Sequence, residues 1–175
     1  MDQGDAQAFN LSGYIRNLPE NRPEILETLT SKDSDFYNLN DGIRLCLIFN
    51  GENFKNSQFL PRDGTGKDVE KIRETFEKLD FVVELVQDPI VDEIKDKIGE
   101  IQKRNELCCL ALFILTHGEA DGLLHAHDSS YRLNKTIIAE LLPDHCPSLA
   151  GRPKLIFIQA CQGKRNKFQT KIRKS

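Results

Sequence analysis

A cysteine and a histidine each end an apolar run in this 175-residue sequence, and together they could perform nucleophilic catalysis. Cys161 follows the run 154–158 and lies within the pentapeptide Gln159–Gly163, while His117 ends the run 107–116, 44 residues earlier. Only a thiolate attacks efficiently, and an ordinary cysteine pKa of about 8.5 leaves few thiolates at neutral pH, so the thiol needs a base nearby. The two runs predict a cysteine nucleophile and a histidine base if their strands are neighbours.

Each of these residues also has a simpler interpretation when it is taken alone. A cysteine in a strand is usually a buried, inert thiol, and a lone histidine usually lies at the surface or makes a structural hydrogen bond. The position of Cys161 between a strand end and Gly163 favours catalysis. Gly118 would let the main chain approach a substrate, and its N–H and that of Cys161 could both point at a developing oxyanion.

The elements that must position these residues alternate along the chain. We expect strands at 43–49, 80–86, 107–116 and 154–159, and helices marked by apolar residues at 69–79, 90–101 and 133–142. Thr65 is the expected cap of the first of these helices. Near-continuous apolar strands separated by amphipathic helices predict an α/β fold, with a mostly parallel sheet covered on both faces.

Composition excludes several other classes of protein. Lysine and arginine number 24 and aspartate and glutamate 27, and the net charge of −3 argues against nucleic acid as the main partner. No apolar stretch is long enough to cross a membrane, and the acidic start of the chain is unlike a secretory signal. Five cysteines without an export signal predict reduced thiols and a cytoplasmic location.

Several motifs, in order, resemble the large catalytic subunit of a caspase, in particular the executioner type with a short leader. Thr116–Glu119 is similar to the Ser-His-Gly-Glu of that family, with threonine in place of serine. The other matching segments are Tyr37–Leu39, Leu47–Asn50 with Asn53-Phe54, Arg62–Thr65 followed by Asp68, Arg73–Phe76, Phe81–Val83, Cys146–Leu155 and Gln159–Gly163. The resemblance covers about residues 37–163.

The resemblance implies a three-layer fold and an aspartate-directed cysteine endopeptidase that acts in apoptosis and is made as a zymogen. Cys161 would be the nucleophile, His117 the general base and acid, and Gly118 would help to form the oxyanion hole. Arg62 and Gln159 would line the pocket for the substrate aspartate. On its spacing alone, Arg62 would be a solvated loop charge, but a buried carboxylate needs a fork-shaped cationic partner. No cofactor is implied.

Two other chemistries are weaker. His125, His127, His145 and Cys146 could suggest zinc, but their spacing matches no standard closed site, so we expect no metal. The segment Gly64–Lys67 lacks the full spacing of a phosphate-binding loop and does not follow a strand directly.

The sequence also departs from the family it resembles. We expect a leader at 1–36, a large-subunit domain at 37–163 and a basic, disordered tail at 164–175. In such caspases a small subunit follows, adding strands, a second pocket arginine and the dimer contact. Without these strands, the segment 154–159 would be an unpaired apolar edge, and we expect little peptidase activity from this chain alone.

Two functions therefore stay open at this point. In the first, the chain is the catalytic half of an aspartate-directed peptidase, and its partners are a caspase small subunit and protein substrates with aspartate at the cleavage position. In the second, it is a truncated regulator or decoy that binds another caspase without cleaving substrate. The sequence leaves open the oligomeric state, any preference beyond aspartate, and whether a small subunit is supplied by a separate chain.

Overall fold

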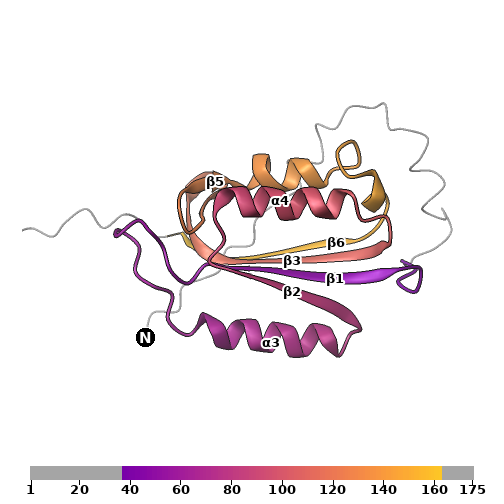
Figure 1. Ribbon diagram of the computed structural model, residues 1–175, viewed down its shortest axis with the longest axis horizontal. Coiled ribbons are helices and arrows are strands. Elements are labelled where there is room, and N and C mark those ends of the chain that lie inside the picture. The colour runs from indigo at the N-terminus through magenta and orange to yellow at the C-terminus, as the bar shows by residue number, and fades with distance from the viewer. Residues whose placement is uncertain (1–36, 163–175) are drawn as a thin grey trace, which may run out of the picture.

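Long apolar runs alternate with amphipathic helices and assemble into a six-stranded sheet over residues 37–162, the part of the chain that the computed structural model describes (Figure 1). The predicted leader at 1–36 and tail at 164–175 lie outside the described residues. The strands are β1 Ile43–Asn50, β2 Phe81–Gln87, β3 Leu107–Glu119, β4 Leu123–His125, β5 Ser130–Arg132 and β6 Lys154–Gln162. The helices are α3 Thr65–Glu77 and α4 Val91–Gln102, with short turns η1 Ala120–Gly122, η2 Asn134–Ile138, η3 Ala139–Leu141 and η4 Pro147–Leu149.

Most of the sheet is parallel, as the sequence predicts. β1 pairs in parallel with β2 on one side and β3 on the other, and β6 pairs in parallel with β3. The short strands β4 and β5 form an antiparallel hairpin that continues from the end of β3. Parallel strands place their carboxyl ends along one border of the sheet, where α/β folds hold their functional residues.

Helices cover both faces, which confirms the three-layer α/β class. On one face, Ile94, Ile98 and Ile101 of α4 pack with the short helices η2 and η3 against a large core cluster. On the other face, Val69 of α3 belongs to a smaller cluster, and Phe76 packs against it. Figure 1 shows the two helices on opposite sides of the strands. None of the described helices is long and apolar enough to cross a membrane.

Strand β3 is the centre of the fold. It is flanked by β1 and β6 over most of its length, and its residues 107–112 are all buried. Its side chains alternate between the two clusters: Leu112 and Ile114 face α4, whereas Phe113 and Leu115 face α3. A strand covered on both faces and both edges explains why this run is apolar almost throughout.

Strand β6 forms one border of the described sheet. Within residues 37–162 it pairs only with β3, and its outward side chains Leu155 and Phe157 are each 44% exposed. The Phe157 ring nevertheless stacks on Phe113, with ring centroids 4.5 Å apart. The predicted apolar edge at 154–159 is therefore present in the described part of the chain.

Both site-bearing strands are longer than the sequence predicts. β3 continues three residues past the predicted end at Thr116, and β6 continues three residues past Gln159. The apolar pattern stops earlier because the added residues are polar or small. They stay in the sheet because β3 and β6 pair with each other there, and because β4 pairs with Gly118 and Glu119.

Three local predictions need correction. The hairpin of β4 and β5 was not predicted, because three-residue strands carry too little periodicity. The predicted helix at 133–142 is a π turn followed by a 3-10 turn, since a wider turn departs from the 3.6-residue period. Thr65 does not cap α3: Gly64 stands at the cap with a φ of 88°, and the Thr65 hydroxyl donates to Asn50 Oδ1 instead.

The core position of Leu112 predicts a large loss of stability on truncation. Leu112 is 0% exposed, so Leu112→Ala should lower the free energy of unfolding by about 3 kcal/mol. The matched control Leu79→Ala removes a side chain that is 52% exposed and should cost less than about 1 kcal/mol. Urea unfolding measures both, and equal losses would contradict the central place of β3.

Candidate active site

The parallel pairing of β3 with β6 brings His117 and Cys161 together. Their Cα atoms are register partners, one on each of two hydrogen-bonded strands, at the carboxyl end of both. Neighbouring strands lie about 4.8 Å apart, so the two residues are close although 44 positions separate them in the sequence. The sequence prediction that these strand ends are neighbours is confirmed.

The His117 ring is held by a main-chain carbonyl. Its Nε2 lies 2.9 Å from the carbonyl oxygen of Leu60. A carbonyl oxygen only accepts hydrogen bonds, so Nε2 must donate, and the neutral ring then keeps its lone pair on Nδ1. The rings of Phe54 and Phe59 both pack on the imidazole, with centroids 4.8 and 5.3 Å from it and 5.8 Å from each other.

Sequence reasoning missed these three contacts. A main-chain carbonyl has no residue type, so nothing in the sequence distinguishes the one at Leu60 from its neighbours. The aromatic residues Phe54 and Phe59 stand in a mostly polar loop, which was the one signal present in the sequence. Together they fix the position of the imidazole before any substrate binds.

Gly118 has a packing reason to be glycine. It pairs with Gln162 on β6 and with Leu124 on β4, so strands approach it from both sides. A Cβ at this position would lie 2.9 Å from the Cβ of Ala160 and 3.1 Å from Leu124 Cδ2. Any side chain would therefore push the strands apart next to the His117–Cys161 pair.

A hydrogen-bond network at the end of β1 orients the Arg62 side chain. Its Nη1 donates to the carbonyl oxygen of Gly51 at 3.0 Å and to Thr65 Oγ1 at 3.3 Å. The Thr65 hydroxyl donates to Asn50 Oδ1 at 2.7 Å, and Asn50 in turn donates to Gln87 at 2.8 Å. Asn50 and Thr65 are 1% and 3% exposed, so this support is buried.

The same network ties Arg62 to the row of the sheet that holds Gln159. The N–H of Gly51 donates to the carbonyl of Leu115 at 2.8 Å, and Leu115 is the register partner of Gln159. Gln159 itself is exposed. The described backbone thus gathers all the predicted site positions at one border of the sheet, with Arg62 and Gln159 two residues before the row of His117 and Cys161.

Asp88 holds the start of the loop that carries Arg62. Its Oδ1 accepts the N–H groups of Glu52 and Asn53 at 2.7 and 2.8 Å, and its Oδ2 accepts the Asn53 side chain at 2.9 Å. Burial acts to raise the pKa of this carboxyl, but these hydrogen bonds outweigh burial and leave the pKa below its ordinary value. The residue has a φ of 49°, a conformation that aspartate and asparagine tolerate.

Comparison with known proteins fits this arrangement. A family model for the caspase domain matches residues 43–174. Caspase drICE of Drosophila melanogaster is 36% identical over 157 residues, which are 88% of this chain and 46% of the relative. The chain belongs to the caspase family. Such caspases are cysteine endopeptidases that cleave after aspartate.

Solved structures of caspases share the fold. Caspase-1 of Spodoptera frugiperda is 34% identical over 170 residues, which are 94% of this chain and 53% of the relative. Its crystal structure superposes with a TM-score of 0.72 over 78% of this chain and 54% of that one. This caspase chain therefore spans about half the length of the curated relatives it matches.

The other cysteines of this caspase chain are unsuited to nucleophilic attack. Cys46, Cys108, Cys109 and Cys146 are all buried, and none of these four described cysteines forms a disulfide. Burial raises the pKa of the Cys46 thiol to about 12, against a smaller opposing effect of Arg73. Burial also raises the pKa of Cys109. Such thiols stay protonated at neutral pH.

The histidines that could have suggested zinc do not gather. Among the described residues, no group of three or more His, Cys, Asp or Glu side chains is placed to hold a metal ion. His125 Nε2 lies 3.3 Å from Glu119 Oε1, and His145 Nδ1 lies 3.4 Å from Glu140 Oε2. Cys146 belongs to the hydrophobic core.

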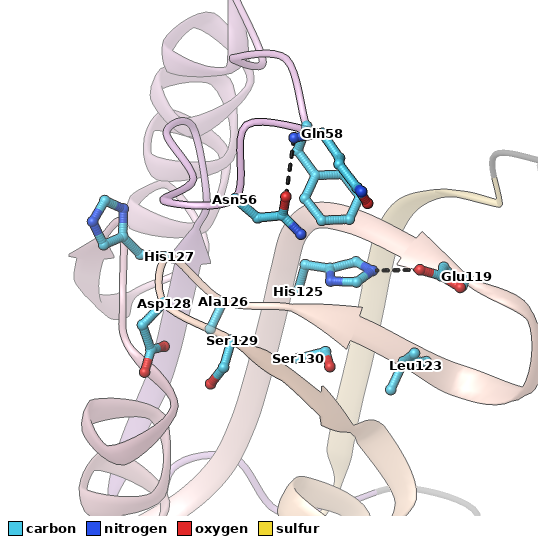
Figure 2. A pocket seen from close by; sticks show the side chains of 11 residues that line it. Asn56, Gln58, Glu119, Leu123, His125, Ala126, His127, Asp128, Ser129 and Ser130 are labelled. Atoms are coloured by element: carbon cyan, nitrogen blue, oxygen red, sulfur yellow. Dashed lines mark hydrogen bonds and ion pairs between the residues drawn. The ribbon is translucent and has the colours of Figure 1, made fainter. Parts of the chain in front are cut away.

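A cavity of about 330 Å³ opens on the hairpin side of the candidate site. Figure 2 shows the loop of Asn56 and Gln58 on one side and the hairpin residues from Leu123 to Ser130 on the other, with Glu119 beside His125. Phe59 also lines it. Sequence reasoning did not find this cavity, because its walls come from segments that are far apart along the chain.

The hydrogen-bond network that orients Arg62 predicts a loss of stability when the Thr65 hydroxyl is removed. Thr65→Val leaves the buried Asn50 without its donor and should lower the free energy of unfolding by about 1–2 kcal/mol. Thr75→Val, at an exposed position of the same helix, is the matched control and should change it by less than about 0.5 kcal/mol. Thermal or urea unfolding compares the two, and similar losses would mean that the network contributes little.

The lowered pKa of Asp88 predicts a pH-dependent contribution to stability. A carboxyl whose pKa is depressed by folding stabilises the protein above its unfolded pKa of about 3.9, and this stabilisation is lost as pH falls through the folded pKa. Asp88→Asn should therefore be less stable than the original chain at pH 7, with a difference that shrinks below about pH 4. Asp96→Asn, at an exposed site on α4, should show no such trend. A difference that is constant with pH would contradict a role for the charge.

Proposed function

We propose that this chain provides the catalytic half of an aspartate-directed cysteine endopeptidase that acts in apoptosis. The observation that carries the proposal is the register pairing of His117 with Cys161, combined with the fixed orientation of the His117 ring. Of the four other cysteines, Cys46 and Cys109 have raised pKa values and all four are buried, which leaves Cys161 as the nucleophile of choice.

The geometry supports different roles for the two nitrogens of the His117 imidazole. Because Nε2 donates to the Leu60 carbonyl, Nδ1 would accept the proton of the Cys161 thiol and later return it to the leaving amine. The Leu60 carbonyl would also stabilise the positive charge of the protonated ring. The N–H groups of Gly118 and Cys161 would receive the oxyanion, at a point where two strands fix the backbone.

Specificity for aspartate would come from Arg62 and Gln159. Capture of a carboxylate by two parallel hydrogen bonds requires a planar guanidinium with a fixed orientation. The bonds from Arg62 Nη1 to Gly51 and Thr65 supply that orientation. The exposed Gln159 lies on the adjacent row of the sheet and would provide an amide to the same carboxylate.

The partner proposed for this half is a caspase small subunit, in a cytoplasmic heterodimer that arises from a zymogen. The open edge of β6, with Leu155 and Phe157 partly exposed, supports this proposal because an apolar strand edge recruits another strand. The same edge also supports the second candidate, a regulator or decoy that pairs with a subunit of another caspase. The two candidates differ in whether Cys161 turns over substrate.

The decisive experiment mixes the full chain with a separately expressed small-subunit segment from a related caspase and measures cleavage of an aspartyl peptide. We expect activity that appears on mixing, disappears in Cys161→Ala, and falls at least tenfold in kcat/KM in Arg62→Lys, because lysine cannot form the bidentate contact. Arg73→Lys, on the surface of α3, is the matched control and should keep full activity.

Three outcomes separate the candidates. Activity that depends on Cys161 supports the peptidase. A chain that binds the small-subunit segment, remains inactive and lowers the activity of an intact caspase supports the regulator. Activity that survives Cys161→Ala would contradict both the assignment of the nucleophile and the mechanism derived from it.

A further inference from the structure

The cavity of about 330 Å³ has no part in the aspartate pocket described above. It lies between the loop that contains Phe59 and the β4–β5 hairpin, and its size is at the lower end of the range of about 300–1,000 Å³ that is usual for small-ligand sites. It is also directly connected with the catalytic histidine. The Phe59 ring stacks on His117 at 5.3 Å and contacts the His125 ring at 4.2 Å, so one aromatic ring separates His117 from the cavity wall.

The position of the cavity relative to Arg62 decides which part of a substrate could reach it. Along the loop, Arg62 follows Leu60 and bonds to Gly51 and to Thr65 at the start of α3, whereas Phe59 precedes Leu60 and packs on His125 of the hairpin. A peptide whose aspartate contacts Arg62 would have its cleaved bond at His117 and Cys161. A chain that continues beyond that bond toward Phe59 would pass the mouth of the cavity.

The walls of the cavity are acidic and rich in acceptors. Glu119 and Asp128 contribute two carboxylates, and none of the residues that line the cavity is lysine or arginine. Figure 2 shows Glu119 next to His125 and Asp128 beside Ser129 at the turn of the hairpin. The amides of Asn56 and Gln58, the imidazoles of His125 and His127 and the Phe59 ring also line the cavity, and a phenyl face favours a cation.

The carboxylate of Asp128 is fixed in place. Its Oδ1 accepts the N–H of Val91 at the start of α4, at 3.0 Å. Burial acts to raise the pKa of this carboxyl, but hydrogen bonds from Val91, from Ser129 and from its own main chain outweigh burial and lower the pKa, which keeps it charged at neutral pH. The bond to Val91 directs this carboxylate toward the start of α4, so Asp128 contributes a fixed negative charge at the hairpin turn.

We propose that this cavity is a specificity subsite for a lysine or arginine side chain at the second or third residue after the cleaved bond. Its position within a substrate rests on the proposed function, whereas its preference for a basic side chain does not. Glu119 would be the carboxylate nearest to the bound cation beside His125, Asp128 would add negative charge from the hairpin turn, and Phe59 is shared between the subsite and His117.

A binding experiment on the full chain tests the site without any need for activity. Backbone amide spectra are recorded by NMR at pH 8 during titration with N-acetyl-glycyl-lysine amide and with the norleucine analogue, which has a similar length and no charge. We expect shifts confined to residues 56–59 and 119–130, and affinity for the lysine probe roughly fivefold higher. The double variant Glu119→Gln, Asp128→Asn should abolish this difference, whereas Glu70→Gln, on the surface of α3, should preserve it.

The result that would overturn the proposal is equally specific. Equal binding of the two probes, shifts elsewhere in the spectrum, or a lysine preference that survives the double variant would each exclude a cation subsite in this cavity. Both exchanges replace a carboxylate by an amide of the same shape, so the fold should persist, and the amide spectrum itself verifies this.

A second measurement places the site along the substrate. Peptides that differ only in lysine, norleucine or glutamate at the second or third residue after aspartate are compared in the reconstituted enzyme. We expect kcat/KM to fall in that order at one of the two positions, by roughly fivefold per step, and the order to weaken in high salt. Lysine binding without turnover of any peptide contradicts the proposed function and leaves the cation site standing. Turnover with no preference at either position overturns the subsite.

Discussion

The parallel pairing of β3 with β6 is the interaction on which the candidate site depends. A shift of one residue in this register would turn the side chains of one strand to the opposite face and separate the row of His117 from that of Cys161. Packing opposes such a shift, because Phe113 and Phe157 stack on one face while Leu112 and Ile156 pack on the other. The lack of a side chain at Gly118 lets the strands stay close where the chemistry would occur.

A second constraint is the loop that joins β1 to α3. It carries Arg62, the Leu60 carbonyl and Phe59, and so it contributes to the proposed aspartate pocket, to the orientation of His117 and to the cavity at once. A loop of this length would sample many conformations if it were free. Hydrogen bonds at its two ends, to Asp88 near its start and from Thr65 to Asn50 at its close, restrict it. The three contributions are therefore coupled, and a change that loosens the loop would affect all of them.

The residues that form the buried core are different from those at the open border of the site. The buried residues of β1, β3 and α4 form one continuous core, and the site lies at its border. Among the described strands that carry site residues, β6 is the one with an unpaired edge. This arrangement agrees with the proposed half-site, in which a partner would add the next strand beside β6.

The order of the long strands and helices follows from the sequence alone, because apolar residues repeat with the period of each element. The sequence also predicts a nucleophile and a base, since Cys161 and His117 both end apolar runs in motifs of one family. The tertiary structure alone decided the contact with Leu60, the hairpin of β4 and β5, the network beneath Arg62 and the cavity beside Phe59. These features depend on main-chain atoms or on contacts between residues that are distant along the chain. Neither kind of contact leaves a periodic pattern in the sequence.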